Sequence, residues 1–538
     1  MLPSLSSTSE QAVCPSFRVR SAKWQTSRLG TVLAGLLLAL FATLAHAAPG
    51  DLDLSFGSGF GKVLLPRAGS DGATAVAVQA DRKILISGNC RASSGANPPR
   101  EFCVVRLSES GAPDPTFGVN GVATVEVPGS SVFPTTTGIA LLGSGKIVLG
   151  GSCFDSALQR DQLCLTRLNS DGTLDTSYGT NGLAKIGWGT QFIFARSLAT
   201  QVDDHVVIGA TCEPPSASQW SLCALRVTPN GQLDTTFGVA GGASALILDH
   251  NEAGGIAIQP DGKIVLSGRC ESAVALSPFL FCAVRLLANG EADPSFGVSG
   301  SGIVSYVVGS NSGDSANSAL LIQRDGKIVL GGRCRTSASA SLSFCLLRLH
   351  VNGTVDNSYG ATGLLIAIDT NIEAEVNSMV LQADGKIVLG GTCTVTTDPT
   401  LRDFCLARIH EDGALDKSFS SDGKVVTPIG SGKDGISALA LQPDGKVIAV
   451  GSCDTGSDPD YCIARYEGGP ATGQQCSFDI DGDGKVLATV DGLIAARISL
   501  GITGSAVIGG VVFPPTATRS TWAAIRTFLN VQCGFRLP

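Results

Sequence analysis

Short runs of apolar, β-branched and small residues alternate along this chain with turns that are rich in glycine and aspartate. In one stretch such runs cover residues 253–259, 263–268, 281–286 and 302–308, each of the length of a β-strand. The pattern predicts a unit of about 60 residues with four strands, which recurs along the chain. The 67 glycines and 16% charged residues agree with many short strands joined by tight turns.

Three signatures recur in a fixed order and define the unit. The first is a turn with the pattern Asp-x-Ser/Thr-aromatic-Gly. Its seven copies begin at Asp53, Asp114, Asp175, Asp234, Asp293, Asp356 and Asp416, and the last copy has Ser420 in place of the final glycine.

The second signature is a hairpin turn followed by an apolar strand, as in Asp261-Gly262-Lys263. An Asp-Gly pair between apolar runs predicts a tight hairpin in which both central residues take positive φ. The lysine returns as Lys83, Lys146, Lys327, Lys386 and Lys446, and His205 replaces it in the third unit.

The third signature is Cys-x-x-Arg, also present seven times. Its arginines are Arg106, Arg167, Arg226, Arg285, Arg348, Arg408 and Arg465. Four antiparallel strands repeated radially form a propeller blade, so we expect an all-β fold, a seven-bladed β-propeller. An open linear stack of the same units is the alternative, but it would leave two sheet edges exposed.

The phase of the repeat favours a closed ring. The segment from Asp53 to Pro66 reads as the end of a unit, whereas the seventh unit stops after its third strand at Tyr466. We therefore expect the N-terminal strand to complete the last blade.

With these three motifs the chain resembles the delta-60 repeat proteins of bacteria, over roughly Asp51 to Gly469. The resemblance implies a secreted or surface propeller-like protein and carries no activity with it.

Each unit has a second cysteine shortly before its Cys-x-x-Arg. Cysteines at the mouth of one hairpin lie within reach of a disulfide, which would stabilise each loop by about 2 to 3 kcal/mol. Thiolate metal binding is the alternative, but the pairs lack further Cys or His ligands. We predict seven disulfides, which join Cys90 to Cys103, Cys153 to Cys164, Cys212 to Cys223, Cys270 to Cys282, Cys334 to Cys345, Cys393 to Cys405 and Cys453 to Cys462.

Residues 1–47 resemble a secretory signal peptide. Four basic residues precede an apolar run from Leu29 to Leu44, and Ala45-His46-Ala47 offers small residues for cleavage. A retained membrane anchor is the alternative, although the run is short for a span. Cleavage takes the formal charge from −8 to −11, which argues against a nucleic acid or an anionic membrane as partner, and we expect no membrane span in the mature protein.

The repeated arginine and aspartate recur in every unit, so we interpret them as an internal ion pair and turn cap. The histidines of the repeats lie at unrelated phases and suggest no catalytic cluster. We therefore predict no catalytic residue and no enzyme, with a carbohydrate-active enzyme that uses the propeller channel as the alternative.

The pattern ends near Gly468; residues 469–475 read as a linker, and 476–538 as a separate module. The sequence from Asp479 to Val486 has acidic residues at positions 1, 3 and 5 and glycine at position 6 of a calcium loop. It resembles dockerin-type and other EF-hand-like loops, with one loop instead of two and Asp491 one residue beyond the usual glutamate. The expected Ca²⁺ ligands are Asp479, Asp481, Asp483, the Lys485 carbonyl and, as a further candidate, Asp491; Cys476 and Cys533 would form the module's disulfide.

These features predict an exported propeller of residues 48–468, most simply a monomer, that presents variable loops to a protein or glycan ligand. A calcium-stabilised C-terminal module would dock or orient it. A carbohydrate-active enzyme and a cell-surface adhesion or structural protein are the alternatives.

Overall fold

A computed structural model of the 538-residue chain describes residues 47–468 with short gaps, together with parts of 480–526. The gaps are 66–71, 92–99, 129–134, 189–191, 202, 216–218, 272–279, 298–299, 309–314, 336–341, 361–362, 369–372, 395–400 and 457–458. In the C-terminal part the described residues are 480, 488–500, 502–514, 517 and 520–526.

Seven four-stranded antiparallel sheets confirm the predicted fold, a seven-bladed β-propeller. Blades 1 to 4 consist of β2 (Ala73–Val78), β3 (Ile84–Arg91), β4 (Arg100–Leu107) and β5 (Val122–Val125); β6 (Thr135–Leu141), β7 (Ile147–Asp155), β8 (Arg160–Leu168) and β9 (Leu183–Ile186); β10 (Ile193–Thr200), β11 (Val206–Cys212), β12 (Ser221–Val227) and β13 (Gly242–Ala245); and β14 (His250–Ile258), β15 (Ile264–Glu271), β16 (Leu280–Leu286) and β17 (Ile303–Val307).

The remaining blades repeat this order, and the last one draws its outer strand from the other end of the chain. Blades 5 to 7 consist of β18 (Ser315–Ile322), β19 (Ile328–Cys334), β20 (Ser343–Leu349) and β21 (Leu364–Ile368); β22 (Ala374–Leu381), β23 (Ile387–Cys393), β24 (Asp403–Ile409) and β25 (Lys424–Thr427); and β26 (Gly435–Leu441), β27 (Val447–Asp454), β28 (Pro459–Tyr466) and β1 (Lys62–Leu65).

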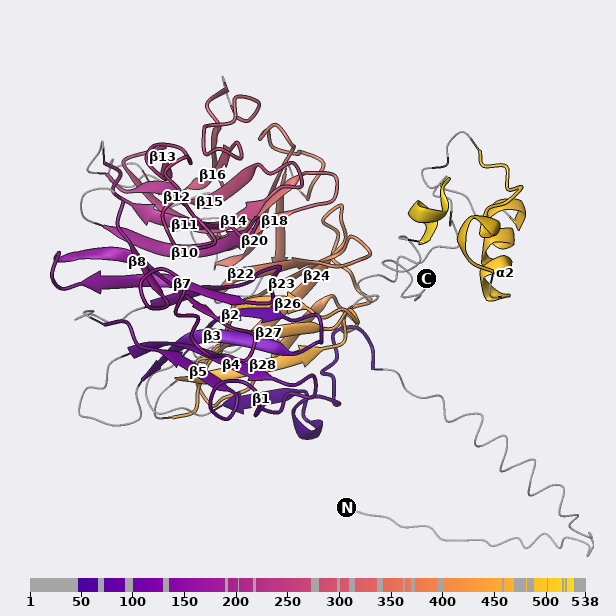
Figure 1. The fold of residues 1–538 in the computed structure, drawn as a ribbon, viewed down its shortest axis with the longest axis horizontal. Coiled ribbons are helices and arrows are strands. Elements are labelled where there is room, and N and C mark those ends of the chain that lie inside the picture. Colours follow the sequence, from indigo (N-terminus) through magenta and orange to yellow (C-terminus); the bar gives the residue numbers. More distant parts are fainter. Residues whose placement is uncertain are drawn as a thin grey trace, which may run out of the picture. The chain divides into compact units, whose positions relative to one another are not determined.

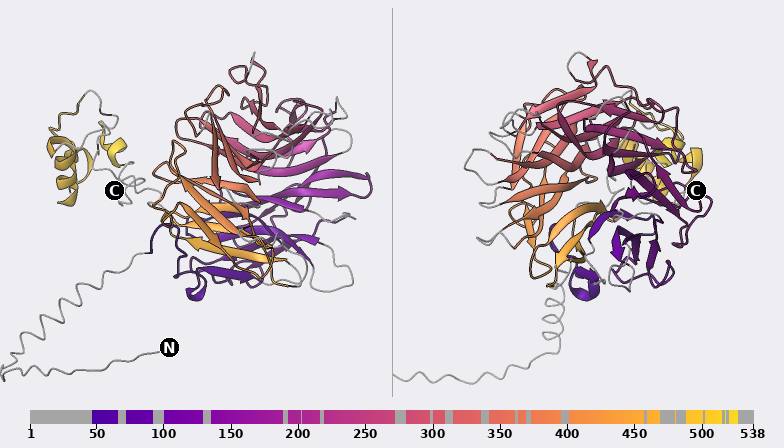
Figure 2. Two further views of the ribbon diagram at one scale, coloured as in Figure 1. Left: turned by 180° about the vertical axis from the view of Figure 1, so that it is seen from behind. Right: turned by 90° about the vertical axis from the view of Figure 1, so that its left-hand side faces the viewer.

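The N-terminal strand closes the ring, as predicted. β1 pairs with β28 from Lys62↔Ala464 to Leu65↔Tyr461, and the indigo β1 lies beside β28 in Figure 1. The inner strands β26 and β2 also contact each other, as the inner strands of all other neighbouring blades do. Figure 2 shows the blades arranged around the central axis. An open stack is therefore excluded.

Apolar side chains fill the space between neighbouring blades, because each sheet turns one face to the blade before it and the other to the blade after it. One such cluster joins Phe56 and Ile84 to Ile448 and Tyr461, which are all fully buried. The last blade thus packs on the first through a core like those between consecutive blades.

The hairpin between the first two strands of a blade differs from our prediction. In blade 4 the Gln259 N–H donates to the Lys263 carbonyl and the Gly262 N–H to the Gln259 carbonyl. The loop thus has three residues, and only Gly262 has positive φ, at 82°. This is a type I turn closed by a left-handed glycine, which suits the restricted φ of Pro260 at its first position.

The C-terminal part contains a π-helical turn, η3 (Ala488–Gly492), followed by α2 (Leu493–Ser499) and a 3₁₀ turn, η4 (Gly504–Val507). Residues 522–526 are also helical. Ile480, Val490, Ile494, Val507 and Ile525 form a small buried cluster of their own. Across the described parts of the chain, no helix is long and apolar enough to cross a membrane.

Candidate functional site

The repeated arginine and aspartate form an ion pair in every blade, as predicted. The Arg Nε lies 2.6 to 2.9 Å from Asp Oδ2 in all seven copies. The guanidinium also lies over the aromatic ring of the same turn, at 4.2 to 4.9 Å from its centre. In blade 1 the Arg106 Nη1 donates to the Ser170 carbonyl of blade 2, so the motif holds neighbouring blades together.

The same aspartates cap their turns and keep their charge. Asp53 Oδ1 accepts hydrogen bonds from the backbone and the hydroxyl of Ser55. Burial alone would raise the pKa of Asp53, but the hydrogen bonds from Lys446 and Ser55 and the charge of Arg465 outweigh it and lower the pKa to about 2. These residues belong to the scaffold.

Seven of the eight predicted disulfides are present, one in each blade. Their cysteines lie on the second and third strands of the blade, with Cα atoms 5.6 to 6.1 Å apart. Cys476 and Cys533, the eighth predicted pair, lie outside the described residues. In chain order the bonds join Cys90 to Cys103, Cys153 to Cys164, Cys212 to Cys223, Cys270 to Cys282, Cys334 to Cys345, Cys393 to Cys405 and Cys453 to Cys462.

Because the blades are copies of one unit, positions where they differ are informative about function. One such position precedes the first cysteine, and its side chain faces the next blade. In blades 1 to 3 this side chain accepts a hydrogen bond from a backbone N–H of the next blade. Asn89 Oδ1 accepts from Thr136, Ser152 Oγ from Ala195 and Thr211 Oγ1 from Ala253, at 2.8 to 3.0 Å. Along the chain the residues are Asn89, Ser152, Thr211, Arg269, Arg333, Thr392 and Ser452.

Arg269 and Arg333 replace these small side chains in blades 4 and 5. Arg333 Nη1 donates to Glu375 Oε2 of blade 6, whereas Arg269 Nη2 donates to Glu252 Oε1 of its own blade. The residue opposite this position, on the first strand of each blade, also differs among the blades. In blades 2 to 7 it is Thr135, Phe194, Glu252, Ser315, Glu375 and Gly435. Large aromatic and charged side chains therefore occur at these positions in blades 3 to 6, and small ones in blades 7, 1 and 2.

Four aromatic side chains form a row where blade 3 meets blade 4. Phe192 and Phe194 stack with ring centres 6.3 Å apart, Trp220 lies 6.2 Å from Phe194, and His250 lies 4.5 Å from Trp220. Phe192 is 38% exposed, and the other three are half-buried. Rings that are half in water offer a flat apolar surface to a ligand.

Charged side chains continue the site in blades 4 to 6. Glu252 Oε1 lies 2.9 Å from Arg269 Nη2 and 3.4 Å from His250 Nε2. Between blades 5 and 6 a crevice of about 220 Å³ is lined by Arg333, Glu373, Glu375 and Arg402, among others. Arg402 Nη2 lies 2.7 Å from Glu373 Oε2, and Arg333 Nη1 lies 3.3 Å from Glu375 Oε2.

We call this set of side chains the blade 3–6 site. Its members are Phe192, Phe194, Trp220, His250, Glu252, Arg269, Arg333, Glu373, Glu375 and Arg402. The shared motifs of the repeat do not indicate this site, because its residues are departures from those motifs. An alignment of the seven units that looked for departures from the shared pattern would have marked Arg269 and Arg333.

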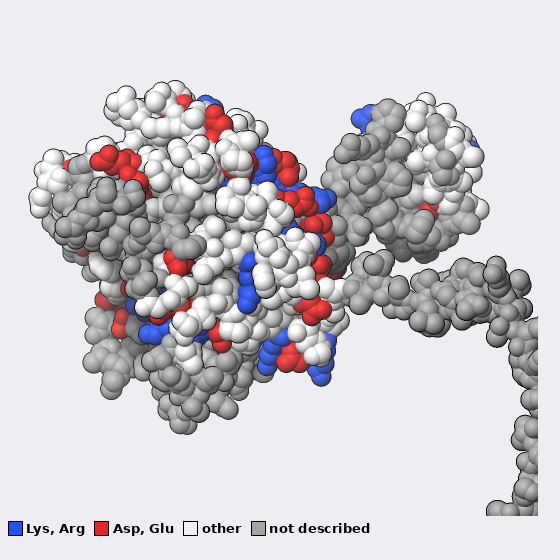
Figure 3. Space-filling view, turned by 90° about the horizontal axis from the view of Figure 1, so that it is seen from below, with Lys and Arg blue, Asp and Glu red and all other residues white. Residues whose placement is uncertain are grey.

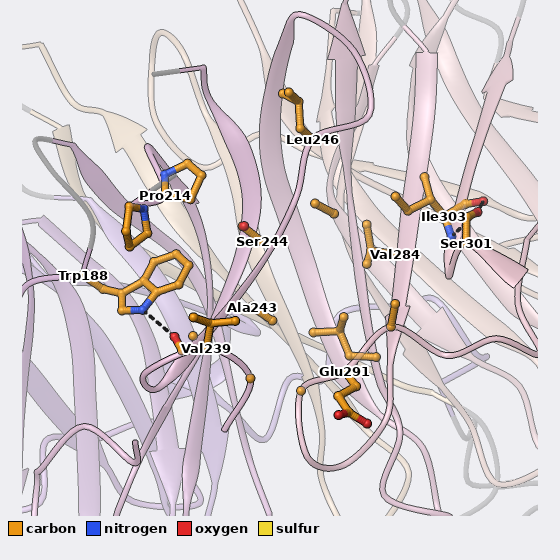
Figure 4. A pocket seen from close by; sticks show the side chains of 17 residues that line it. Trp188, Pro214, Val239, Ala243, Ser244, Leu246, Val284, Glu291, Ser301 and Ile303 are labelled. Carbon is orange, nitrogen blue, oxygen red and sulfur yellow. Dashed lines mark hydrogen bonds between the residues drawn. The ribbon is translucent and has the colours of Figure 1, made fainter. Parts of the chain in front are cut away.

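A second hollow, the blade 3 pocket, has a volume of about 600 Å³ and lies around β13. In Figure 4, Trp188 and Pro214 lie on one side of Ala243 and Ser244, and Val284 and Ile303 lie on the other. The pocket exists because β13 has only small side chains. At Gly242 an added Cβ would lie 2.4 Å from Trp188 Cε2, so the glycine allows the indole to pack over the strand.

Of the predicted calcium ligands, only Asp491 lies within the described residues. It is buried, and its Oδ1 accepts the Ile480 N–H at 2.6 Å. Asp479, Asp481, Asp483 and Lys485 lie outside the described part. Where side chains are described, no group of three or more His, Cys, Asp or Glu residues is arranged to hold a metal.

Basic and acidic side chains alternate on the face shown in Figure 3, without a large area of either sign. The expectation of no nucleic-acid partner agrees with this distribution but stays a prediction.

Five segments of the chain match a family model described as "Domain of unknown function (DUF5122) beta-propeller": residues 79–117, 142–178, 259–296, 323–359 and 382–419. Each match spans the hairpin turn, the Cys-x-x-Arg strand and the aromatic-Gly turn of one blade. This agrees with the repeat-propeller part of our interpretation. No curated protein matches the chain.

Several solved propellers resemble the chain in fold. An α-L-arabinofuranosidase from Fusarium graminearum is 10% identical, with a TM-score of 0.40, over 76% of this chain and 97% of that one. A glucose dehydrogenase is 13% identical, with a TM-score of 0.35, over 61% and 95%. The β-propeller domain of the Trilobed protease from Pyrococcus furiosus, whose title reports an open velcro topology, is 11% identical, with a TM-score of 0.37, over 74% and 96%.

These neighbours contradict our prediction that the protein is not an enzyme, because propellers similar to this one include an arabinofuranosidase and a glucose dehydrogenase. The prediction rested on the lack of a recognisable catalytic cluster in the sequence. A catalytic site can instead be assembled from residues of different blades, and such a site leaves no cluster in the sequence. At these identities the likeness is one of fold and assigns neither activity to this chain.

Proposed function

We propose that this protein is an exported β-propeller that binds a glycan at the blade 3–6 site. The observation that carries the proposal is the aromatic row of Phe192, Phe194, Trp220 and His250. Within the described residues no other blade has such a row, so packing of the scaffold does not depend on it.

The chemistry of the site suits a sugar. The faces of sugar rings carry C–H groups that pack on aromatic rings, while their hydroxyls need donors and acceptors in fixed positions. Glu252 and Arg269 supply both beside His250, and the crevice of Arg333 and Glu375 continues the polar surface into blades 5 and 6. Because four neighbouring blades contribute side chains, we expect an oligosaccharide as the ligand rather than a single sugar.

Export is part of the proposal. The signal-like segment of residues 1–47 and seven disulfides, which persist in oxidising compartments, both support it.

A glycan array with the full-length mature protein, followed by calorimetry, tests the proposal. Trp220→Ala should weaken binding of the retained oligosaccharide by about fivefold or more, if stacking of a sugar on the indole contributes about as much as the 1–3 kcal/mol of a nucleic-acid base on an aromatic ring. Trp522→Ala, a tryptophan of the C-terminal part, is the matched control and should bind like the parent. Equal affinity of both variants would refute the proposed site.

A carbohydrate-active enzyme is the second candidate. The observation that favours it is the pair of carboxylates, Glu373 and Glu375, in one crevice, since glycoside hydrolysis commonly uses two carboxyl groups beside the scissile bond. The release of reducing ends from the bound oligosaccharide tests this candidate. Activity that Glu373→Gln or Glu375→Gln abolishes without loss of binding would establish it, and intact oligosaccharide after long incubation would reject it.

For the C-terminal part we propose a calcium loop that orients or docks the propeller. The bond from Ile480 to Asp491 supports it, because Ile480 directly follows Asp479 and the bond draws the two ends of the loop sequence together. Oxygen ligands of aspartates at alternate positions are those that Ca²⁺ prefers.

A further inference from the structure

The blade 3 pocket surrounds a strand with an open edge. β13 is the outermost strand of blade 3, so only one of its edges is bonded, to β12. The Arg226 N–H donates to the Gly241 carbonyl, and backbone direction alternates along a strand. Ala243 and Ala245 therefore face β12, while the backbone groups of Ser244 and Leu246 face outward.

The two ends of this open edge differ. At Gly242 the edge is covered by the chain itself, because the Val239 N–H donates to the Gly242 carbonyl at 2.7 Å. Beyond it, Ser244 is exposed and Leu246 is 44% exposed. A short stretch of backbone donors and acceptors is thus accessible inside a hollow of about 600 Å³.

Apolar walls rise on both sides of this edge. Trp188 and Pro214 lie on one side, and Val284 and Ile303 lie on the other (Figure 4). Pro215 and Leu286 also line the pocket. Side chains of an extended peptide point alternately to the two sides of its backbone. A strand added to β13 would therefore place successive side chains on opposite walls.

The outer strand β9 of blade 2 borders a smaller hollow, of about 240 Å³. At the position of Gly242 the outer strands of the other blades carry Val122, Leu183, Ile303, Leu364, Lys424 and Lys62. A larger side chain there would fill the space that the Trp188 indole and the pocket occupy in blade 3.

The charge of the pocket indicates which residue types its ligand should carry. Glu291 is the single charged side chain among the residues that line it. A partner that reaches it would place a lysine or arginine beside this carboxylate.

We propose that blade 3 binds an extended peptide segment of a partner protein as a fifth strand on β13. The segment carries apolar side chains at alternate positions and one basic residue beside Glu291. Backbone hydrogen bonds to Ser244 and Leu246 give affinity, and the two walls select the side chains, as in other cases of strand addition. This site is separate from the proposed glycan site and does not depend on it.

Selection of a phage-displayed library of random linear peptides on the immobilised full-length protein tests the proposal. The enriched peptides should show alternating apolar residues with one Lys or Arg. Ser244→Pro removes the outward N–H at a position where an edge strand tolerates proline, and it should weaken peptide binding by about tenfold or more. Thr124→Pro, the same register position on β5, is the matched control and should bind like the parent.

Two further variants complete the test. Gly242→Val forces the Trp188 indole out of its place and should also abolish binding, which keeps the proposal testable if Ser244→Pro fails to fold. Glu291→Gln should remove the preference for a basic residue. Selection without an enriched motif, or peptides that bind Ser244→Pro and Gly242→Val as tightly as the parent, would overturn the proposal.

Discussion

Ring closure depends on the N-terminal turn, and Phe56 is the residue at which this can be measured. Phe56 is fully buried between blades 7 and 1. The Arg465 guanidinium lies 4.7 Å from its ring centre, and an added Cβ at Gly111 of blade 1 would lie 2.7 Å from the ring. Phe56→Ala should therefore lower the free energy of unfolding by about 3–5 kcal/mol, the usual cost of emptying such a site.

Two phenylalanines serve as controls for this variant. Phe60 lies in the same N-terminal segment but is 70% exposed, so Phe60→Ala should change stability by less than about 0.5 kcal/mol. Phe237 fills the equivalent site between blades 3 and 4, and Phe237→Ala should cost as much as Phe56→Ala.

Urea unfolding of the oxidised protein, followed by far-UV circular dichroism, compares the four proteins. Deletion of residues 51–67 should destabilise the whole array further, because it also removes β1. If Phe56→Ala unfolded at the same urea concentration as Phe60→Ala, the ring would not be closed through this turn.

Three more predictions concern charge, disulfides and calcium. Asp53 has a folded pKa of about 2, below the usual value of about 3.9; its contribution to stability is present above about pH 4 and lost as the pH falls toward 2. Asp53→Asn should therefore be less stable at pH 7 and show a shallower loss of stability over this range, measured by thermal unfolding against pH, with the exposed Asp51→Asn unchanged. Peptide mapping without reduction should find eight disulfides and no free thiol in the mature chain, and a pair that links two different blades would contradict the fold. Calorimetry should detect one Ca²⁺ bound with a Kd of about 10⁻⁴ M, lost in Asp481→Ala and Asp483→Ala; no heat at millimolar calcium would leave this segment an ordinary turn.

The scaffold could be predicted from the sequence because its residues recur. Seven copies of the Asp turn, the hairpin and the Cys-x-x-Arg strand fix the number of blades, and the early end of the seventh unit at Tyr466 indicates where the ring closes. The same repetition explains the ion pair, since a residue present in every blade must serve what every blade needs.

The candidate sites could not be predicted in the same way. Their residues differ from the repeat pattern in one blade each, and only the fold brings them together. Phe194 on β10, Trp220 just before β12 and His250 on β14 are separated by 26 to 30 residues in the sequence, yet their rings lie side by side. The blade 3 pocket depends on the missing side chain of Gly242, on the small side chain of Ala243 and on the indole of Trp188. The hairpin geometry differs from the expected two-residue turn because one residue precedes the Asp-Gly pair in the loop. This residue is Pro260 in blade 4 and Arg324 in blade 5, and only the glycine then takes positive φ.

Tryptophan fluorescence tests the central claim, glycan binding at the blade 3–6 site, most directly. The chain has four tryptophans: Trp24 lies in the signal-like segment, and replacing Trp188 and Trp522 by phenylalanine leaves Trp220 as the reporter in the mature protein. Titration with an oligosaccharide retained on the array should shift the Trp220 emission to shorter wavelength and saturate at the calorimetric Kd, because the sugar excludes water from a half-exposed indole. Binding without any change in the Trp220 emission would contradict the account.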